Sequence, residues 1–203
     1  HVVTGSGSEV GTALGEHAGV AGITFTGSAE VGLEIYRSST AEPRPVICEM
    51  GGKNPVIVNA DADLDAAVEG TVRSAFGFGG QKCSAASRGL VARPLYDSFV
   101  ERLAAAAAAL VVGGSTARPT ALGPLIDERA VARYEEAVGE ATSRGRVVTG
   151  GRRLTDGDLA RGNYVAPTVV EAPADSWIWK RELFAPVLAV TAYDHAQVAG
   201  RLA

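Results

Sequence analysis

Short apolar runs rich in β-branched residues alternate along this chain with longer segments whose apolar residues recur every three or four positions. We expect strands over 23–25, 45–49, 54–58, 87–92, 147–149, 164–170 and 186–193. We expect helices over 29–37, 61–74, 96–110 and 127–143, and a further one from about Ala196. Strands and helices that alternate in this way are typical of an α/β fold, which is the fold class we predict.

The bulk composition excludes several functional classes. The 203 residues, 46% of them hydrophobic and 21% charged, are enough for one large or two modest domains with a buried core. A net charge of −4 argues against binding to nucleic acid. No apolar run reaches the roughly 18 residues of a membrane span. Two cysteines make no disulfide framework, so we expect a reducing, cytoplasmic setting.

Three glycine-containing segments suggest how the chain is organised. Residues 1–5 read as the end of a strand entering a glycine loop, so we expect a piece of a longer protein. Residues 4–11 look like a phosphate loop, but their glycine spacing is not G-x-G-x-x-G. Residues 25–28 predict a strand, a tight turn and a helix start, with Ser28 as N-cap, a geometry that presents N–H groups to an anion. The double glycine 51–52 suggests a domain boundary.

Cys83 is the candidate nucleophile. A thiolate attacks aldehydes and thioesters, and the glycines that precede Cys83 would let a ligand approach the backbone closely. The alternative is that Cys83 is a small buried apolar residue, the common role of a lone cysteine. Cys48 lies inside an apolar strand, where core packing is favoured.

Glu49 is the candidate base. It ends a predicted strand and is followed closely by two glycines, and in open α/β sheets such a carboxylate points into a crevice, where it could activate water. The alternative is a solvated surface acid. Taken alone, Glu49 would be assigned to the surface.

Four motifs together resemble the aldehyde dehydrogenase superfamily. They are FTGS at 25–28, EMGGKNP at 49–55, GQKC at 80–83 and ELFAP at 182–186, and they extend the resemblance over essentially the whole chain. Residues 61–65 and 74–88 are similar to a narrower branch, the 1-pyrroline-5-carboxylate (glutamate 5-semialdehyde) dehydrogenases. The chain departs from the usual pattern at Gly79, at Arg181 and at Ala185.

The resemblance implies a role for each site residue. Cys83 would attack the aldehyde carbon, its backbone N–H would help hold the oxyanion, and Glu49 would activate the water that hydrolyses the resulting thioester. Ser84 would contact the substrate. The residues implied for cofactor binding are Gly27, Ser28, Gly32, Met50, Glu182 and Phe184. No residue is assigned to a metal.

The resemblance also implies the wider setting. Residues 1–50 would be the C-terminal part of a Rossmann-type dinucleotide-binding domain, and residues 51–203 most of an α/β catalytic domain truncated at its C-terminus. The cofactor would be NAD, with NADP left open, the substrate a small aldehyde, and the full-length protein a homo-oligomer. Another aldehyde, a CoA-acylating relative or a non-catalytic fragment remain as alternatives.

Overall fold

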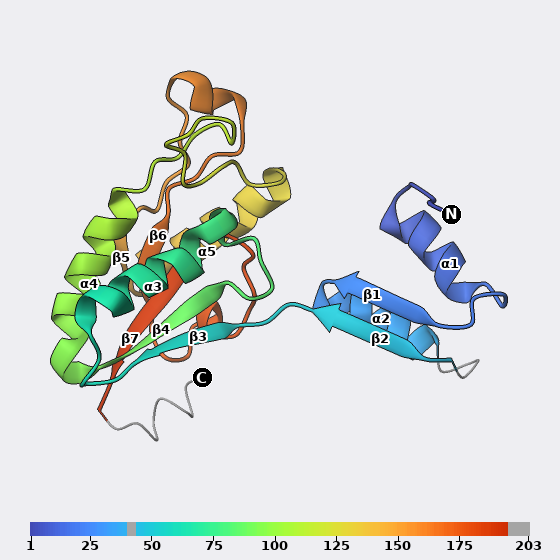
Figure 1. Ribbon diagram of the computed structural model, residues 1–203, viewed down its shortest axis with the longest axis horizontal. Helices are drawn as coiled ribbons and strands as arrows, with labels where there is room; N and C mark the ends of the chain where they lie inside the picture. The colour runs from blue at the N-terminus through green and yellow to red at the C-terminus, as the bar shows by residue number, and fades with distance from the viewer. Residues whose placement is uncertain (40–43, 195–203) are drawn as a thin grey trace. The chain divides into compact units, whose positions relative to one another are not determined.

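The computed structural model describes residues 1–39 and 44–194, and the chain forms two compact units, His1–Gly51 and Gly52–Ala203 (Figure 1). Each unit has its own sheet and is described by itself. The helix expected from Ala196 lies outside the described residues.

The first unit is a β-α-β arrangement. Strands β1 (Ile23–Gly27) and β2 (Val46–Met50) pair in parallel, and helix α2 (Ala29–Ser38) connects them and packs on both. The helix begins at Ala29 because Ser28 is its N-cap, with Oγ accepting from Val31 N at 3.3 Å. A π-helical turn, η1 (Gly7–Gly11), and a short helix, α1 (Thr12–Glu16), precede β1.

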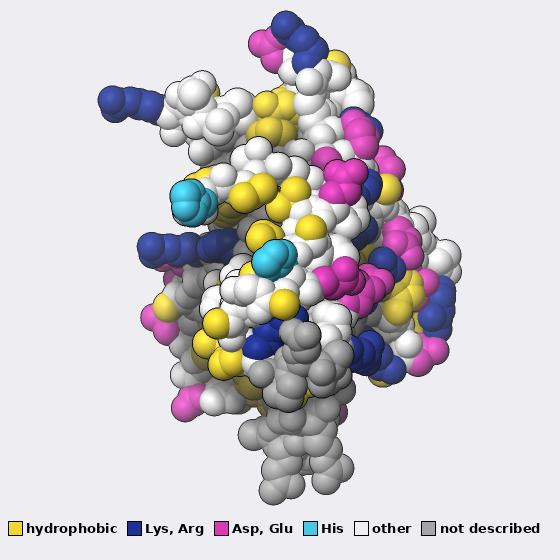
Figure 2. Space-filling model, turned by 90° about the vertical axis from the view of Figure 1, so that its right-hand side faces the viewer, with side chains coloured by type: hydrophobic (Ala, Val, Ile, Leu, Met, Phe, Trp, Pro, Cys, Tyr) yellow, Lys and Arg dark blue, Asp and Glu magenta, His cyan; other side chains and the backbone are white. Residues whose placement is uncertain are grey.

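The first unit buries little apolar surface. Among its described residues only Gly32 and Ser39 are buried, whereas Val31, Leu33 and Ile47 are each more than two-fifths exposed. Hydrophobic side chains lie open among polar ones on the face shown in Figure 2. A two-stranded sheet covered by one helix is marginal by itself, so these residues derive little stability from one another.

The second unit contains a five-stranded sheet in the order β3-β4-β7-β6-β5. Its strands are β3 (Asn54–Val58), β4 (Ala86–Ala92), β5 (Arg146–Thr149), β6 (Thr168–Glu171) and β7 (Val187–Tyr193). Every neighbouring pair is parallel except β5 with β6. Strand β3 lies at the edge, where Pro55 costs no ladder bond on the open side.

Helices cover both faces of this sheet (Figure 1). Helices α3 (Leu64–Phe76) and α4 (Arg93–Ala108) pack on one face, and α5 (Glu128–Arg144) packs on the other. Successive residues of β7 alternate between the two layers: Leu188 belongs to the α3–α4 core and Ala189 to the α5 core. Burial on both faces explains why residues 187–190 of β7 are all apolar. The short helices η2 (Gly77–Gly80), η3 (Gly157–Arg161) and η4 (Trp177–Trp179) join these elements.

The α/β expectation is confirmed, and several element ends differ from the pattern-based prediction. Residues 1–4 form no strand, although the sequence pattern predicts the end of one there. The strand expected from Tyr164 begins at Thr168, and Val165 makes only an isolated bridge to Arg153. Helix α4 begins at Arg93 rather than at 96, since Pro94 is tolerated in a first helical turn.

Candidate active site

Cys83 lies in an exposed turn between η2 and β4. The turn runs from Lys82 to Ala85 and is closed by a hydrogen bond from Ala85 N to Lys82 O, at 3.1 Å. Cys83 and Ser84, the two central residues, are both exposed. The alternative of a buried apolar cysteine is therefore wrong for Cys83. Cys48, in β2, is half-buried, and its thiol donates to Gly32 O at 3.5 Å.

Two glycines bring the chain into this turn. Gly79 and Gly80 have φ values of +65° and +67°, in the left-handed region that glycine adopts at little cost. Gly80 also has no room for a side chain, because a Cβ there would lie 2.5 Å from Ala185 O. The backbone before Cys83 therefore touches the backbone of the segment that carries Glu182 and Phe184.

The segment 182–185 forms the second part of the site. Glu182 Oε1 accepts from Gly52 N at 3.4 Å, and Phe184 has a left-handed backbone with φ of +51°. A pocket of about 10 Å³, room for roughly one water molecule, is lined by residues of this segment, by Gly52 and by residues of the Cys83 loop. Phe184 remains 39% exposed.

The third part of the site is the segment 52–54, for which sequence reasoning assigned no side-chain role. Asn54 Nδ2 donates to Cys83 O at 2.7 Å and to Ala85 O at 3.1 Å. The carbonyl of Lys53 accepts from Arg88 Nη2. The available sequence signal is an amide residue two positions after a double glycine, which indicates a tight turn but does not identify the partner of the amide.

Lys53 is an ionisable group inside this site. Its Nζ is buried and has no hydrogen-bond partner among the described residues. Burial is the main cause that lowers the pKa of Lys53 from 10.5 to about 8; the positive charge of Arg88 lowers it further, and the carboxylate of Glu182 opposes both. An appreciable fraction of Lys53 is therefore neutral near pH 8.

Four of the residues assigned to the cofactor lie together in the first unit. Gly27 ends β1, Ser28 caps α2, and Gly32 is buried where a Cβ would stand 2.6 Å from Met50 Sδ. The missing side chain at Gly32 lets α2 pack closely on β2. The start of α2 carries positive partial charge on its first N–H groups, so these residues fit a pyrophosphate.

Glu49 is exposed on β2, opposite Thr26 of β1 in the strand register. It belongs to the first unit, whereas Cys83, Ser84, Glu182 and Phe184 belong to the second. The structure thus brings together Cys83, Ser84, Glu182 and Phe184 in one unit and Gly27, Ser28, Gly32 and Met50 in the other. The pairing of Glu49 with Cys83 is a proposal.

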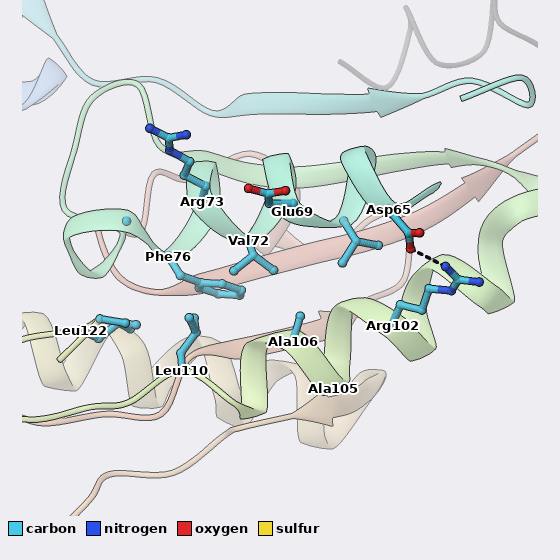
Figure 3. A pocket seen from close by; sticks show the side chains of 13 residues that line it. Asp65, Glu69, Val72, Arg73, Phe76, Arg102, Ala105, Ala106, Leu110 and Leu122 are labelled. Atoms are coloured by element: carbon cyan, nitrogen blue, oxygen red, sulfur yellow. Dashed lines mark hydrogen bonds and ion pairs between the residues drawn. The ribbon is translucent and has the colours of Figure 1, made fainter. Parts of the chain in front are cut away.

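A second, larger pocket of the second unit lies elsewhere. It has a volume of about 650 Å³ between α3 and α4, is lined by apolar residues such as Val72, Phe76 and Leu110, and has the Asp65–Arg102 ion pair at one end (Figure 3). None of the predicted site residues lines it. Within residues 1–39 and 44–194 no group of three or more His, Cys, Asp or Glu could hold a metal, and no helix is long and apolar enough to cross a membrane.

Comparison with known proteins extends over the whole chain. The model of the aldehyde dehydrogenase family matches residues 1–203. 1-Pyrroline-5-carboxylate dehydrogenase 1 of Halalkalibacterium halodurans is 41% identical over 204 aligned positions, covering 96% of this chain and 39% of the relative. Glutarate-semialdehyde dehydrogenase of Pseudomonas putida is 40% identical over 199 positions, with coverages of 97% and 40%.

Solved structures of aldehyde dehydrogenases also resemble this chain. Betaine aldehyde dehydrogenase from Staphylococcus aureus in complex with NAD+ superposes with a TM-score of 0.95 at 32% identity, over 98% of this chain and 40% of that structure. A 1-pyrroline-5-carboxylate dehydrogenase mutant from Thermus thermophilus gives a TM-score of 0.90 at 37% identity, over 98% and 39%. The chain thus spans about two-fifths of the length of these relatives. Its full-length match to the family model shows that the chain belongs to the aldehyde dehydrogenase family.

Proposed function

We propose that the full-length protein is an NAD(P)-dependent aldehyde dehydrogenase that oxidises glutamate 5-semialdehyde to glutamate. The observation that carries the proposal is the exposed thiol of Cys83, held in a glycine-preceded turn against the segment of Glu182 and Phe184. The 41% identity to a 1-pyrroline-5-carboxylate dehydrogenase favours this substrate. A nearly equal identity, 40%, to a glutarate-semialdehyde dehydrogenase makes that homologous semialdehyde the main competitor.

In the proposed reaction Cys83 acts as nucleophile. Its sulfur bonds to the aldehyde carbon as the thiol proton is released, which gives a thiohemiacetal. The Cys83 N–H donates to the developing oxyanion, a contact worth about 3 kcal/mol. The bound nicotinamide cofactor supplies the acceptor for the hydride that leaves this carbon. The product of that step is a thioester on Cys83.

Glu49 acts as general base in the second half-reaction. Its carboxylate takes a proton from water as the water oxygen attacks the thioester carbon, the carbon–sulfur bond breaks, and the acid leaves with the thiolate restored. Ser84 contacts the substrate. Ser28 and the start of α2 hold the pyrophosphate, with Gly27, Gly32 and Met50 shaping that turn. Glu182 binds the nicotinamide ribose, and Phe184 packs near the ring.

The remaining parts of the proposal concern the whole protein. NAD is the proposed cofactor, since the similar S. aureus enzyme was solved with NAD+, and NADP is the alternative that the assay compares. The proposed protein is a cytoplasmic homo-oligomer, with residues 1–50 contributing to the dinucleotide-binding domain and 51–203 to the catalytic domain. The paucity of cysteines fits a reducing compartment.

The test follows reduced cofactor by absorbance for the full-length protein and its variants. The wild-type protein is assayed with glutamate 5-semialdehyde and with glutarate semialdehyde, with NAD and with NADP, and with and without CoA. Cys83→Ala should abolish turnover, whereas the matched control Cys48→Ala should keep it within about threefold. Glu49→Gln should still give a burst of about one reduced cofactor per site and then stop, because hydride transfer precedes hydrolysis.

Three results of this comparison would reject parts of the proposal. Undiminished turnover of Cys83→Ala would remove the nucleophile assignment. Faster oxidation of glutarate semialdehyde than of glutamate 5-semialdehyde would replace the substrate. Turnover that requires CoA would show an acylating enzyme instead.

A further inference from the structure

We propose that Asn54 is a positioning residue for Cys83: its side-chain amide bridges the carbonyls of Cys83 and Ala85 and fixes the peptide between Cys83 and Ser84. The inference rests on the proposed function only in taking Cys83 as the nucleophile. Asn54 is half-buried at the first position of β3, 29 residues before Cys83 in the sequence.

The orientation of the Asn54 amide follows from its partners. Nδ2 lies 2.7 Å from Cys83 O and 3.1 Å from Ala85 O, and both partners are carbonyl oxygens that only accept. The side-chain oxygen cannot take that place, so the NH₂ group faces the turn. Its two hydrogens match the two acceptors, one for each.

Asn54 holds the central peptide of the turn, whose orientation sets the turn type. In a turn from Lys82 to Ala85, the central peptide joins Cys83 to Ser84, and its carbonyl is Cys83 O. The common turn types I and II differ by a flip of this peptide, and type II requires a positive φ at the third residue. Among the described non-glycine residues only Phe78 and Phe184 have a positive φ, so Ser84 keeps a negative one. The hydrogen bond from Asn54 stabilises this orientation.

Asn54 is itself held in place by contacts of the two residues before it. Gly52 N donates to Glu182 Oε1, and Lys53 O accepts from Arg88 Nη2, so the two residues before Asn54 are tied to other parts of the second unit. The register of β3 with β4 shifts between Asn54 and Pro55. Asn54 pairs with Ala86, the first residue of β4, which follows directly after the turn.

The consequence for chemistry is geometric. A flip of the Cys83–Ser84 peptide changes ψ of Cys83 and exchanges an N–H for a carbonyl oxygen in the peptide that follows the thiol-bearing residue. An oxygen there disfavours a thiolate and an oxyanion, both of which are negative. Small misplacements of reacting groups cost up to about a hundredfold in rate. Loss of the Asn54 amide should therefore lower kcat more than it alters cofactor binding.

The experiment compares three variants in the full-length protein. Asn54→Leu keeps the approximate volume without polar atoms, and Asn54→Asp keeps the shape but replaces the donors by a carboxylate. Asn163→Asp is the matched control, since the side chain of Asn163 accepts a hydrogen bond from Arg153 Nη2 and a carboxylate can accept it too. The measurements are kcat, the KM for NAD, and hydrogen exchange of the amides at 84–86.

Both Asn54 variants should lose roughly ten- to a hundredfold in kcat, with the KM for NAD within about twofold of the wild-type value. Exchange at 84–86 should accelerate about tenfold while exchange in α5 stays unchanged. The kcat deficit of Asn54→Asp should shrink from about pH 8 to about pH 6, because a carboxyl between two carbonyl oxygens regains its proton and a donor. The deficit of Asn54→Leu should not change over this range.

If both Asn54 variants kept the wild-type kcat and the wild-type rate of hydrogen exchange at 84–86, the proposal would be overturned. Acceleration of exchange throughout the unit, or equal kcat deficits of the two variants at every pH, would reduce Asn54 to a structural residue and overturn it too. Faster local exchange in a protein whose wild type oxidises no aldehyde would support the anchor and reject the dehydrogenase assignment, so the two failures are distinguishable.

Discussion

Replacement of Gly80 by alanine is expected to be the most damaging single-methyl change near the site. A Cβ at position 80 would stand 2.5 Å from Ala185 O and 3.1 Å from Ala75 O, and both atoms belong to backbone that cannot rotate away. The left-handed φ of +67° adds about 1 kcal/mol, and overpacking against backbone adds about 2 kcal/mol. We therefore expect a loss of about 3 kcal/mol in the free energy of unfolding.

Alanine variants at two other glycines of the same unit measure the cost of the left-handed backbone and of the close contact separately. Gly79 has the same left-handed backbone, with φ of +65°, but its nearest neighbour is the flexible side chain of Gln81 at 3.3 Å. Gly79→Ala should therefore cost about 1 kcal/mol. Gly70, exposed in the middle of α3, has nothing within 4 Å of a new Cβ, so Gly70→Ala should stabilise by up to about 1 kcal/mol.

The assay is denaturant unfolding of the three variants, together with their thermal midpoints. A cost of about 3 kcal/mol corresponds to a midpoint lowered by roughly 6–12 °C in a protein of this size. The comparison of Gly80→Ala with Gly79→Ala isolates the backbone contact with Ala185. A Gly80→Ala variant that loses no more stability than Gly79→Ala would refute the close approach of these two segments.

Two further stability predictions concern buried polar groups. Tyr134→Phe should cost about 1–3 kcal/mol in denaturant unfolding, because the fully buried hydroxyl lies 2.6 Å from Thr168 Oγ1 and 2.9 Å from Ala166 O; a similar loss in the exposed control Tyr36→Phe would contradict this. The pKa of Lys53 falls from 10.5 in the unfolded chain to about 8 in the fold, so the unfolded state binds more protons between these values and stability should rise with pH from about 8 to 10.5. Unfolding of Lys53→Met at several pH values should lack this rise, and an equal rise in the variant would show that Lys53 is not its source.

The elements that sequence predicts well are those set by local pattern. Helix α2 was expected to begin after Ser28, and it does, because an N-cap is a short-range hydrogen bond between neighbours in sequence. The spacing of the apolar residues of α3 likewise follows from helical periodicity, and the apolar residues 187–190 of β7 follow from burial on both faces. The ends of strands depend on partners instead. Strand β6 begins at Thr168 because its pairing with β7 begins there, at Thr168 opposite Val187.

The candidate reactive residues of the site can be proposed from the sequence, but the contacts that support them cannot. Cys83 could be singled out because a thiol after several glycines is a chemical signal. The contact of Gly80 with Ala185 and the bridge from Asn54 to Cys83 join residues 105 and 29 positions apart, and nothing in either local pattern names the partner. The lowered pKa of Lys53 is non-local in the same way, because burial and the charge of Arg88 cause it.

Some motif residues of the second unit make structural contacts, and others keep their side chains exposed. Gly80 approaches the backbone of Ala185 closely, and Asn54 bridges two carbonyls of the Cys83 turn. Gly52 N donates to the side-chain carboxylate of Glu182. The side chains of Lys82, Cys83, Ser84 and Phe184 remain exposed. A surface loop can hold a nucleophile in one geometry only if such contacts restrain it, since exposed side chains contribute little packing. These motifs therefore set the shape of the loop that carries Cys83. If Cys83 is the nucleophile, as proposed, variants at the glycines and at Asn54 should impair the reaction while the thiol itself is intact.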